Sequence, residues 1–175
     1  MNKKAQGFTI VELLIVIVVI AILATISTAA YSSIRDSARK AKINADLTQL
    51  EKAIIVARNN TGKTLYQITG NGMTASPCAG LDSGTDIAGL DDAHNCKANY
   101  RQALTRISDA SGINVKSLFD PYGRPYWIDE NEGASGSCDL DRLGTFSYPL
   151  QKGTSPDKVV YPRLVSLSGN SGCAI

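Results

Sequence analysis

A carboxylate near the N-terminus is the first residue in this sequence whose position suggests chemistry. Glu12 lies within residues 8–30, where almost every other residue is apolar or small. A carboxylate inside a membrane segment costs about 2.5–3.5 kcal/mol, so such a residue usually has a function and a partner. We therefore treat Glu12 as a candidate functional residue that needs a partner for its charge.

The cysteines predict disulfide bonds. No two of them form a Cys-x-x-Cys pair and His94 is the only histidine, which argues against zinc. An even number of cysteines behind an apolar segment favours two disulfides in an oxidising compartment. Three pairings are possible, and we favour the sequential one, Cys78–Cys96 with Cys138–Cys173. With one histidine, no P-loop and no Gly-x-Ser-x-Gly motif, we expect no enzyme.

The charge is distributed unevenly along the chain. Residues 1–60 contain eight basic and four acidic residues, whereas the remainder contains ten basic and twelve acidic residues. Duplex nucleic acids bind mainly to clustered Lys and Arg side chains. The near-neutral C-terminal part therefore predicts no dedicated nucleic-acid site.

The apolar run predicts a long helix. Its 23 residues, 8–30, would span roughly 34 Å, enough to cross a bilayer core of about 30 Å. A cleaved secretory signal is the alternative, because small residues around positions 24–29 offer cleavage points. The length of the run and the presence of Glu12 argue against it. No proline or glycine occurs between Phe8 and Gly62, so the helix is expected to continue to Thr61.

The second half of this helix has two stripes on nearly opposite faces. The small stripe contains Ile34, Ala38, Ala41 and Ala45, and the aliphatic stripe contains Ile43, Leu47, Leu50, Ile54 and Ala57. We expect the aliphatic stripe to pack on the protein's own sheet and the small stripe to face neighbouring subunits. The alternative is a helix buried on both faces within a larger core.

Residues 63–175 predict a small, loop-rich head. A turn-rich connection follows Gly62, and a Cys78–Cys96 disulfide would close a 19-residue loop there, contributing about 3 kcal/mol. A helix is expected over residues 97–111, ended by Gly112. Antiparallel strands are expected over residues 125–129, 145–150 and 163–168, with Trp127 packed on the sheet. The predicted fold class is α+β, a long N-terminal helix whose C-terminal half packs on a small antiparallel sheet with disulfide-tied loops.

The N-terminus closely resembles that of type IV prepilins and type II secretion pseudopilins. The resemblance rests on Lys3 and Lys4, then Gly7, Phe8 and Thr9, then Glu12 and an unbroken apolar helix. It implies that a prepilin peptidase cuts between Gly7 and Phe8 and that the new N-terminal Phe8 is N-methylated. It also implies that Glu12 neutralises the Phe8 amine of an adjacent subunit, which sets the register of assembly.

The resemblance also implies an organisation for the whole chain. Residues 1–7 would be a cytosolic leader, 8–30 a transmembrane and filament-core helix, 31–62 its amphipathic half, and 63–175 a globular pilin head. Pilins often have proline and glycine where this chain has Ala29 and Ala21. We therefore expect the helix to stay continuous in a filament. The Cys138–Cys173 pair resembles the bond that closes the C-terminal region of many pilins.

A second segment, residues 120–126 (Asp-Pro-Tyr-Gly-Arg-Pro-Tyr), resembles a segment of major pseudopilins near which acids can hold calcium. Oxygen ligands for such an ion would come from Asp120, Asp129, Asn131 and Glu132. The alternative is a type I turn with a solvated acidic loop. No other cofactor is expected.

The sequence thus predicts a structural subunit of an extracellular type IV pilus, a filament class linked to adhesion and twitching motility. Its expected partners are copies of itself, the prepilin peptidase and N-methyltransferase, the inner-membrane assembly machinery and, before assembly, the membrane. One alternative is a type II secretion major pseudopilin. Another is a signal-anchored surface binding domain that does not polymerise.

Overall fold

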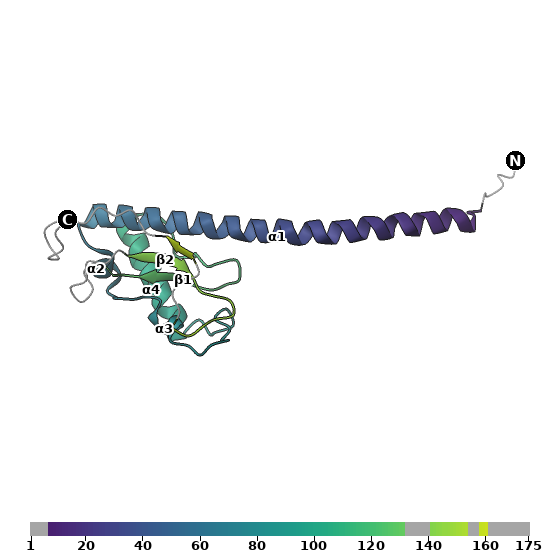
Figure 1. The fold of residues 1–175 in the computed structure, drawn as a ribbon. Coiled ribbons are helices and arrows are strands. Elements are labelled where there is room, and N and C mark those ends of the chain that lie inside the picture. Colours follow the sequence, from purple (N-terminus) through teal and green to yellow (C-terminus); the bar gives the residue numbers. More distant parts are fainter. Residues whose placement is uncertain (1–6, 132–140, 154–157, 161–175) are drawn as a thin grey trace. The chain divides into compact units, whose positions relative to one another are not determined.

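The computed structural model describes residues 7–131, 141–153 and 158–160, without the side chains of residues 26–30 and 158–160. Four helices and three strands lie in this part of the chain (Figure 1): α1 (Ile10–Thr61), α2 (Leu65–Thr69), α3 (Ser76–Ala79), α4 (Asn95–Ser111), β1 (Tyr126–Asp129), β2 (Arg142–Thr145) and β3 (Lys158–Val160). The chain divides into two compact units, Met1–Ala41 and Lys42–Ile175. The fold class is α+β, as the sequence predicted.

Helix α1 confirms the predicted long helix. It is continuous over 52 residues and ends at Thr61. Gly62 then adopts a positive φ of 66° while its N–H donates to the Arg58 carbonyl at 2.8 Å. This left-handed conformation ends the helix. Glycine is favoured at the position because a side chain there would be strained.

The first unit consists mainly of apolar side chains exposed to solvent. From Phe8 to Leu23 the large hydrophobic side chains of this unit are exposed. In the part of the chain that the structure describes, no helix is both long enough and apolar enough to span a membrane. The predicted span, residues 8–30, extends over positions 26–30, whose side chains lie outside the described set.

The second unit contains the hydrophobic core. The aliphatic stripe of α1 is buried there through Leu47, Leu50 and Ile54. It packs with side chains of the sheet and of α4, namely Tyr126, Ile128, Leu143, Tyr100, Leu104 and Ile107. The prediction that this stripe packs on the protein's own sheet is confirmed. In the small stripe, the side chains of Ile34, Ala38, Ala41 and Ala45 are exposed.

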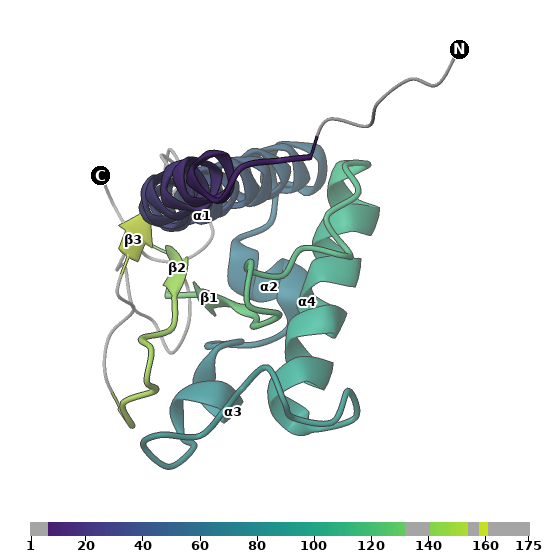
Figure 2. The same cartoon turned by 90° about the vertical axis from the view of Figure 1, so that its right-hand side faces the viewer.

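The sheet has the order β1-β2-β3, with both pairs antiparallel. Figure 2 shows the three strands side by side, with α4 beyond β1. The first predicted strand is confirmed by β1, but the second, residues 145–150, is wrong. The chain pairs earlier, through Leu143 opposite Ile128, and leaves the sheet after Thr145. Pro149 cannot donate to a ladder, and Phe146 and Leu150 pack in a second apolar cluster instead.

The remaining strand predictions have mixed outcomes. Strand β3 was not predicted, because it is only three residues long and too short to show an alternating pattern; all three residues pair with β2. The predicted strand over residues 163–168 lies outside the described residues. Trp127 packs against Phe146, with ring centroids 5.0 Å apart, as expected for an aromatic residue that packs on the sheet.

The connection after Gly62, predicted only as a turn-rich loop, contains two short helices. Helix α2 begins at a capping box in which Thr64 and Gln67 bond reciprocally, and it ends at Gly70 with φ 70°. Helix α3 has a proline in its first turn. Both helices are too short to show an apolar period. Only the Thr64–Gln67 capping box of α2 and Pro77 in the first turn of α3 could have revealed them.

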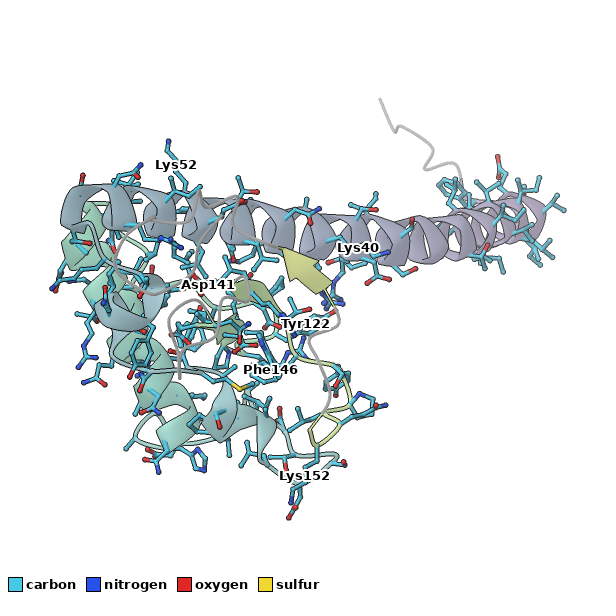
Figure 3. The ribbon with its side chains drawn as sticks, turned by 60° about the vertical axis from the view of Figure 1, so that its left-hand side comes forward. Lys40, Lys52, Tyr122, Asp141, Phe146 and Lys152 are labelled. Carbon is cyan, nitrogen blue, oxygen red and sulfur yellow. A yellow bond between two sulfur atoms is a disulfide. The ribbon has the colours of Figure 1, made fainter. Side chains whose placement is uncertain are left out.

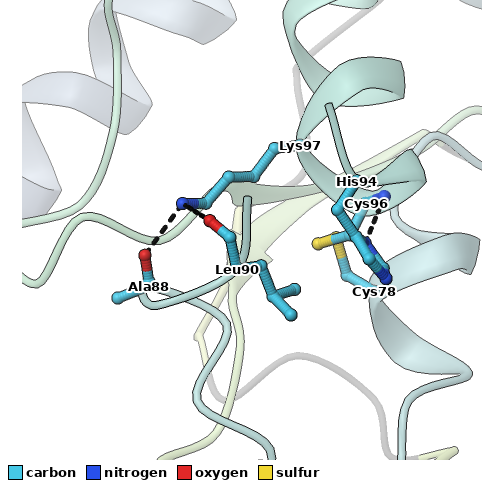
Figure 4. The surroundings of a disulfide bond; sticks show 6 residues. All are labelled: Cys78, Ala88, Leu90, His94, Cys96 and Lys97. Atoms are coloured by element: carbon cyan, nitrogen blue, oxygen red, sulfur yellow. Dashed lines mark hydrogen bonds between the residues drawn. A yellow bond between two sulfur atoms is a disulfide. The ribbon is translucent and has the colours of Figure 1, made fainter. Parts of the chain in front are cut away.

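The disulfide between Cys78 and Cys96 is present and joins α3 to the first turn of α4 (Figure 4). Helix α4 begins two residues before the predicted start because His94 caps it, its Nδ1 accepting from the Cys96 N–H at 3.2 Å. Lys97 Nζ donates to the carbonyls of Ala88 (2.8 Å) and Leu90 (2.6 Å), which fastens the loop before α4. The second predicted disulfide, Cys138–Cys173, lies outside the described residues.

Candidate functional site

The predicted cleavage bond lies in non-helical chain. Gly7 and Phe8 are both exposed and precede the first residue of α1, Ile10. A Cβ built on Gly7 would meet nothing within 4 Å among the described atoms, and its φ is not in the left-handed range. The fold therefore does not require a glycine here. A requirement for glycine at this position would have to come from a molecule that binds the segment.

Thr9 and Glu12 form a reciprocal pair at the start of α1. The Glu12 carboxylate Oε2 accepts from the Thr9 N–H at 2.9 Å and from the Thr9 hydroxyl at 2.7 Å. The Glu12 N–H donates back to the Thr9 hydroxyl at 3.3 Å. This arrangement is a capping box, which satisfies N–H groups at the helix end that have no intrahelical acceptor. This role of Thr9 was not predicted, although Thr-x-x-Glu before an apolar run is its signal.

The capping box defines what Glu12 can do chemically. Its carboxylate is held at the N-terminus of α1, where the helix dipole favours a negative charge. A bond cut before Phe8 would place a new amine one residue before the cap. The predicted pairing of Glu12 with the Phe8 amine of another subunit stays a prediction.

Residues 2–28 match the family model of the prokaryotic N-terminal methylation motif. This chain carries the class III signal of type IV pilins and pseudopilins. The matched segment includes Gly7, Phe8, Thr9 and Glu12. Neither a curated protein nor a solved structure matches the chain.

The motif has several functional implications. It supports a type IV pilin-like or pseudopilin protein and points to a structural, non-enzymatic role. It also implies processing by a peptidase and assembly into filaments. It fits a precursor that is anchored in a membrane and later becomes part of a surface filament.

The second predicted site, the turn over residues 120–124, is built around a buried ion pair. Asp120 Oδ1 accepts from the backbone N–H groups of Tyr122 (2.9 Å) and Arg124 (2.8 Å). Its Oδ2 accepts from Arg124 Nε and lies 2.7 Å from Arg124 Nη2. Gly123 has a φ of 80°, the conformation that this tight turn needs.

This geometry bears on the predicted calcium ligands. Asp120 directs its carboxylate oxygens at Arg124 and at its own turn. Asp129 ends β1 opposite Arg142, and Glu132 lies outside the described residues. Within the described ranges, no group of three or more Asp, Glu, His or Cys side chains could hold a metal ion. The calcium site stays a prediction.

Two polar contacts fix the C-terminal half of α1 to the sheet. The Tyr126 hydroxyl donates to Asp46 Oδ2 at 2.6 Å, and burial together with this carboxylate raises the pKa of Tyr126. Asp46 also pairs with Lys42, whose Nζ donates to the Phe119 carbonyl at 3.2 Å. Farther along α1, Arg58 Nη1 lies 3.3 Å from Asp141 Oδ2, and both side chains are buried. Figure 3 labels Asp141, the β2 side of this second contact.

A buried acid, Glu130, fastens the α2–α3 connection to the end of β1. It is fully buried and accepts from the Thr74 N–H at 2.7 Å and from the Thr74 hydroxyl. Burial raises the pKa of Glu130 to about 7, against the lowering effect of these hydrogen bonds. The prediction for this segment was calcium ligands at Asp129, Asn131 and Glu132, with a solvated acidic loop as the alternative. The burial of Glu130 was not predicted.

Proposed function

We propose that this chain is a structural subunit of an extracellular type IV pilus. The precursor would be cut between Gly7 and Phe8, methylated on Phe8, and polymerised through the N-terminal part of its long helix. The observation that carries this proposal is the match of residues 2–28 to the N-terminal methylation motif. The position of the Gly7–Phe8 bond before α1, in exposed chain, supports it.

The exposed apolar side chains of the first unit support polymerisation. They run from Phe8 to Leu23 and lack a hydrophobic core of their own in the described part of that unit. Burying such surface against other helices, or in lipid, removes it from water at a gain of about 25 cal/mol per Å². The same segment would serve as the membrane anchor of the precursor and as the core of the filament.

The proposed partners and locations follow from this route. Before assembly the chain would be a single-pass protein of the cytoplasmic membrane, contacted by the prepilin peptidase and N-methyltransferase and by the inner-membrane assembly machinery. After assembly it would contact copies of itself in a helical filament on the cell surface. Glu12 would pair with the Phe8 amine of an adjacent copy.

Mass spectrometry of filaments sheared from the cell surface tests this proposal. The expected result is a peptide that begins at Phe8 and carries one added methyl group. Retention of Met1, or the absence of any surface filament, would contradict the proposal. That outcome would favour the second alternative, an anchored surface binding domain that does not polymerise.

A second candidate function is that of a type II secretion major pseudopilin. The segment over residues 120–126, which resembles a segment of that class, favours it. In that class the acids near the segment would hold calcium, so the unfolding temperature of the protein separates the two candidates. A rise with added calcium and not with magnesium supports the pseudopilin. Equal unfolding temperatures with and without added calcium support the pilus subunit.

A further inference from the structure

Two exposed tyrosines lie parallel on the head. The rings of Tyr122 and Tyr148 have centroids 6.3 Å apart and an angle of 3° between their planes. Tyr122 is 46% exposed and Tyr148 is 77% exposed. Tyr122 belongs to the turn before β1, and Tyr148 to the segment after β2, so tertiary structure brings the two rings together (Figure 3 labels Tyr122).

A fixed arginine supports both rings. The Arg124 guanidinium carbon lies 5.1 Å from the Tyr122 centroid and 5.5 Å from the Tyr148 centroid. Arg124 is only 6% exposed, and it is held by Asp120 and by the Ser147 carbonyl, which accepts from Nη1 at 3.3 Å. The parallel surface is therefore already in place before a ligand arrives, which lowers the entropy lost on binding.

We propose that this tyrosine pair, Tyr122 and Tyr148 supported by Arg124, is a stacking site for a neutral polysaccharide. Sugar C–H bonds carry partial positive charge, and they are attracted to the negative face of an aromatic ring. A β-1,4-linked glucan is a flat ribbon, which suits two rings that share one orientation. The hydroxyl of the exposed Tyr148 can both donate to and accept from sugar hydroxyls.

The charges around the pair favour a neutral ligand over a nucleic acid. Single-stranded nucleic acids also stack on aromatic rings, but their phosphates need a positively charged groove. Here the Arg124 charge is balanced by Asp120 at 2.7 Å and is buried. A proline-rich peptide would need a groove between aromatic side chains. The Tyr148 side chain is mostly exposed and therefore does not line such a groove, which argues against a proline-rich peptide.

Calorimetric titration of the full chain with cellohexaose, a neutral β-1,4-linked glucose hexamer, tests this site. The chain is kept in a detergent whose head group is not a sugar, so that the detergent cannot compete. We expect saturable binding that weakens at least about tenfold in Tyr148→Ser. Binding should persist in Tyr148→Trp, which keeps an aromatic face.

Tyr66→Ser is the matched control, because Tyr66 is also an exposed tyrosine (38%) of the head and belongs to α2. It should bind cellohexaose as the unchanged protein does. Absence of saturable binding, or equal binding by Tyr148→Ser, would overturn the proposal. Binding of a thymidine or proline decamer in place of the sugar would overturn it too. So would a Tyr148→Ser effect on filament yield alone, since that would make the pair a contact between copies.

Discussion

Glu12 and Thr9 show how one carboxylate can serve both a helix and an assembly. In the single chain, Glu12 lies in the first turn of α1 and accepts two hydrogen bonds from Thr9. In a filament the same carboxylate is proposed to meet the amine of Phe8 in another copy. The cap and the charge can be separated by substitution, because glutamine also completes a capping box but carries no charge.

We expect Glu12→Ala to enter the membrane normally and to assemble poorly into filaments. Glu12→Gln should assemble as poorly as Glu12→Ala, because the amine would lack its counter-charge in a low-dielectric environment. Thr9→Ala, the control, loses the cap at a cost of about 1 kcal/mol but keeps the charge, so its filament yield should fall less. The measurement is the amount of sheared filament relative to total subunit. A yield from Glu12→Gln equal to that of the unchanged protein would leave Glu12 with only its capping role.

Glu130 predicts an unusual dependence of stability on pH. Burial raises its pKa from 4.5 in the unfolded chain to about 7 in the folded protein. Between these values the folded state binds the extra proton, so this group's contribution is full below pH 4.5 and is lost as pH rises toward 7. The loss is on the order of 3 kcal/mol. Urea unfolding of Glu130→Gln should lack this decline, and parallel pH curves for the two proteins would contradict the prediction.

At the scale of elements, long-range contacts decide how the head packs on α1. The pair between Arg58 and Asp141 joins the last turns of α1 to the residue before β2, and both side chains are almost completely buried. A buried pair need not stabilise a fold more than apolar residues would. Removing one partner is nevertheless costly, because the other charge stays buried.

Asp141→Ala should therefore lower the free energy of unfolding by about 3–5 kcal/mol. The matched control is Asp109→Ala, which removes the exposed pair with Lys116 at 2.8 Å and should cost about 1 kcal/mol or less. Chemical denaturation of both variants gives the two values. Similar costs would mean that water reaches the Arg58–Asp141 contact.

The disulfide between α3 and α4 stabilises a region with short elements. It closes a loop over 18 positions whose described side chains include few large apolar groups, chiefly the buried Ile87. The double variant Cys78→Ser/Cys96→Ser should lose about 3 kcal/mol of stability, because the unfolded chain regains the entropy of the open loop. Loss of protection from amide hydrogen exchange should be greatest in residues 80–94. A uniform loss over the whole head would indicate global destabilisation instead.

At the scale of the whole molecule, the two units have different requirements. The second unit has its own core, whereas the first exposes its apolar side chains. The leader would be lost between synthesis and assembly, and Gly7 has no role in the fold that a larger side chain would disturb. A substitution there therefore separates processing from folding.

Gly7→Ser is expected to accumulate as an uncut precursor, heavier by the seven-residue leader, with the head folded as before. Mass measurement of the membrane fraction detects the leader, and the unfolding temperature reports on the head. Gly62→Ser is a useful contrast, because Gly62 has a φ of 66° and should matter for folding and not for processing. Normal cleavage of Gly7→Ser would contradict the processing role assigned to Gly7.

Local signals in the sequence were enough to predict a large part of this protein. The absence of proline and glycine between Phe8 and Gly62 predicted the extent of α1, and the period of its aliphatic residues predicted the buried face at Leu47, Leu50 and Ile54. The N-terminal motif was recognisable because its residues are contiguous. Cys78 and Cys96 are close in sequence, and their pairing was predicted.

The positions of β2 and β3, the burial of Glu130 and the pairing of Tyr122 with Tyr148 were decided only by the tertiary structure. Thr74 and Glu130 are 56 positions apart, and Arg58 and Asp141 are 83 apart. No period or capping pattern encodes which of several polar residues meets a partner at such separations. That choice depends on the packing of the whole head. The local sequence around a carboxylate does not reveal whether it lies in a surface loop or is buried against the α2–α3 connection.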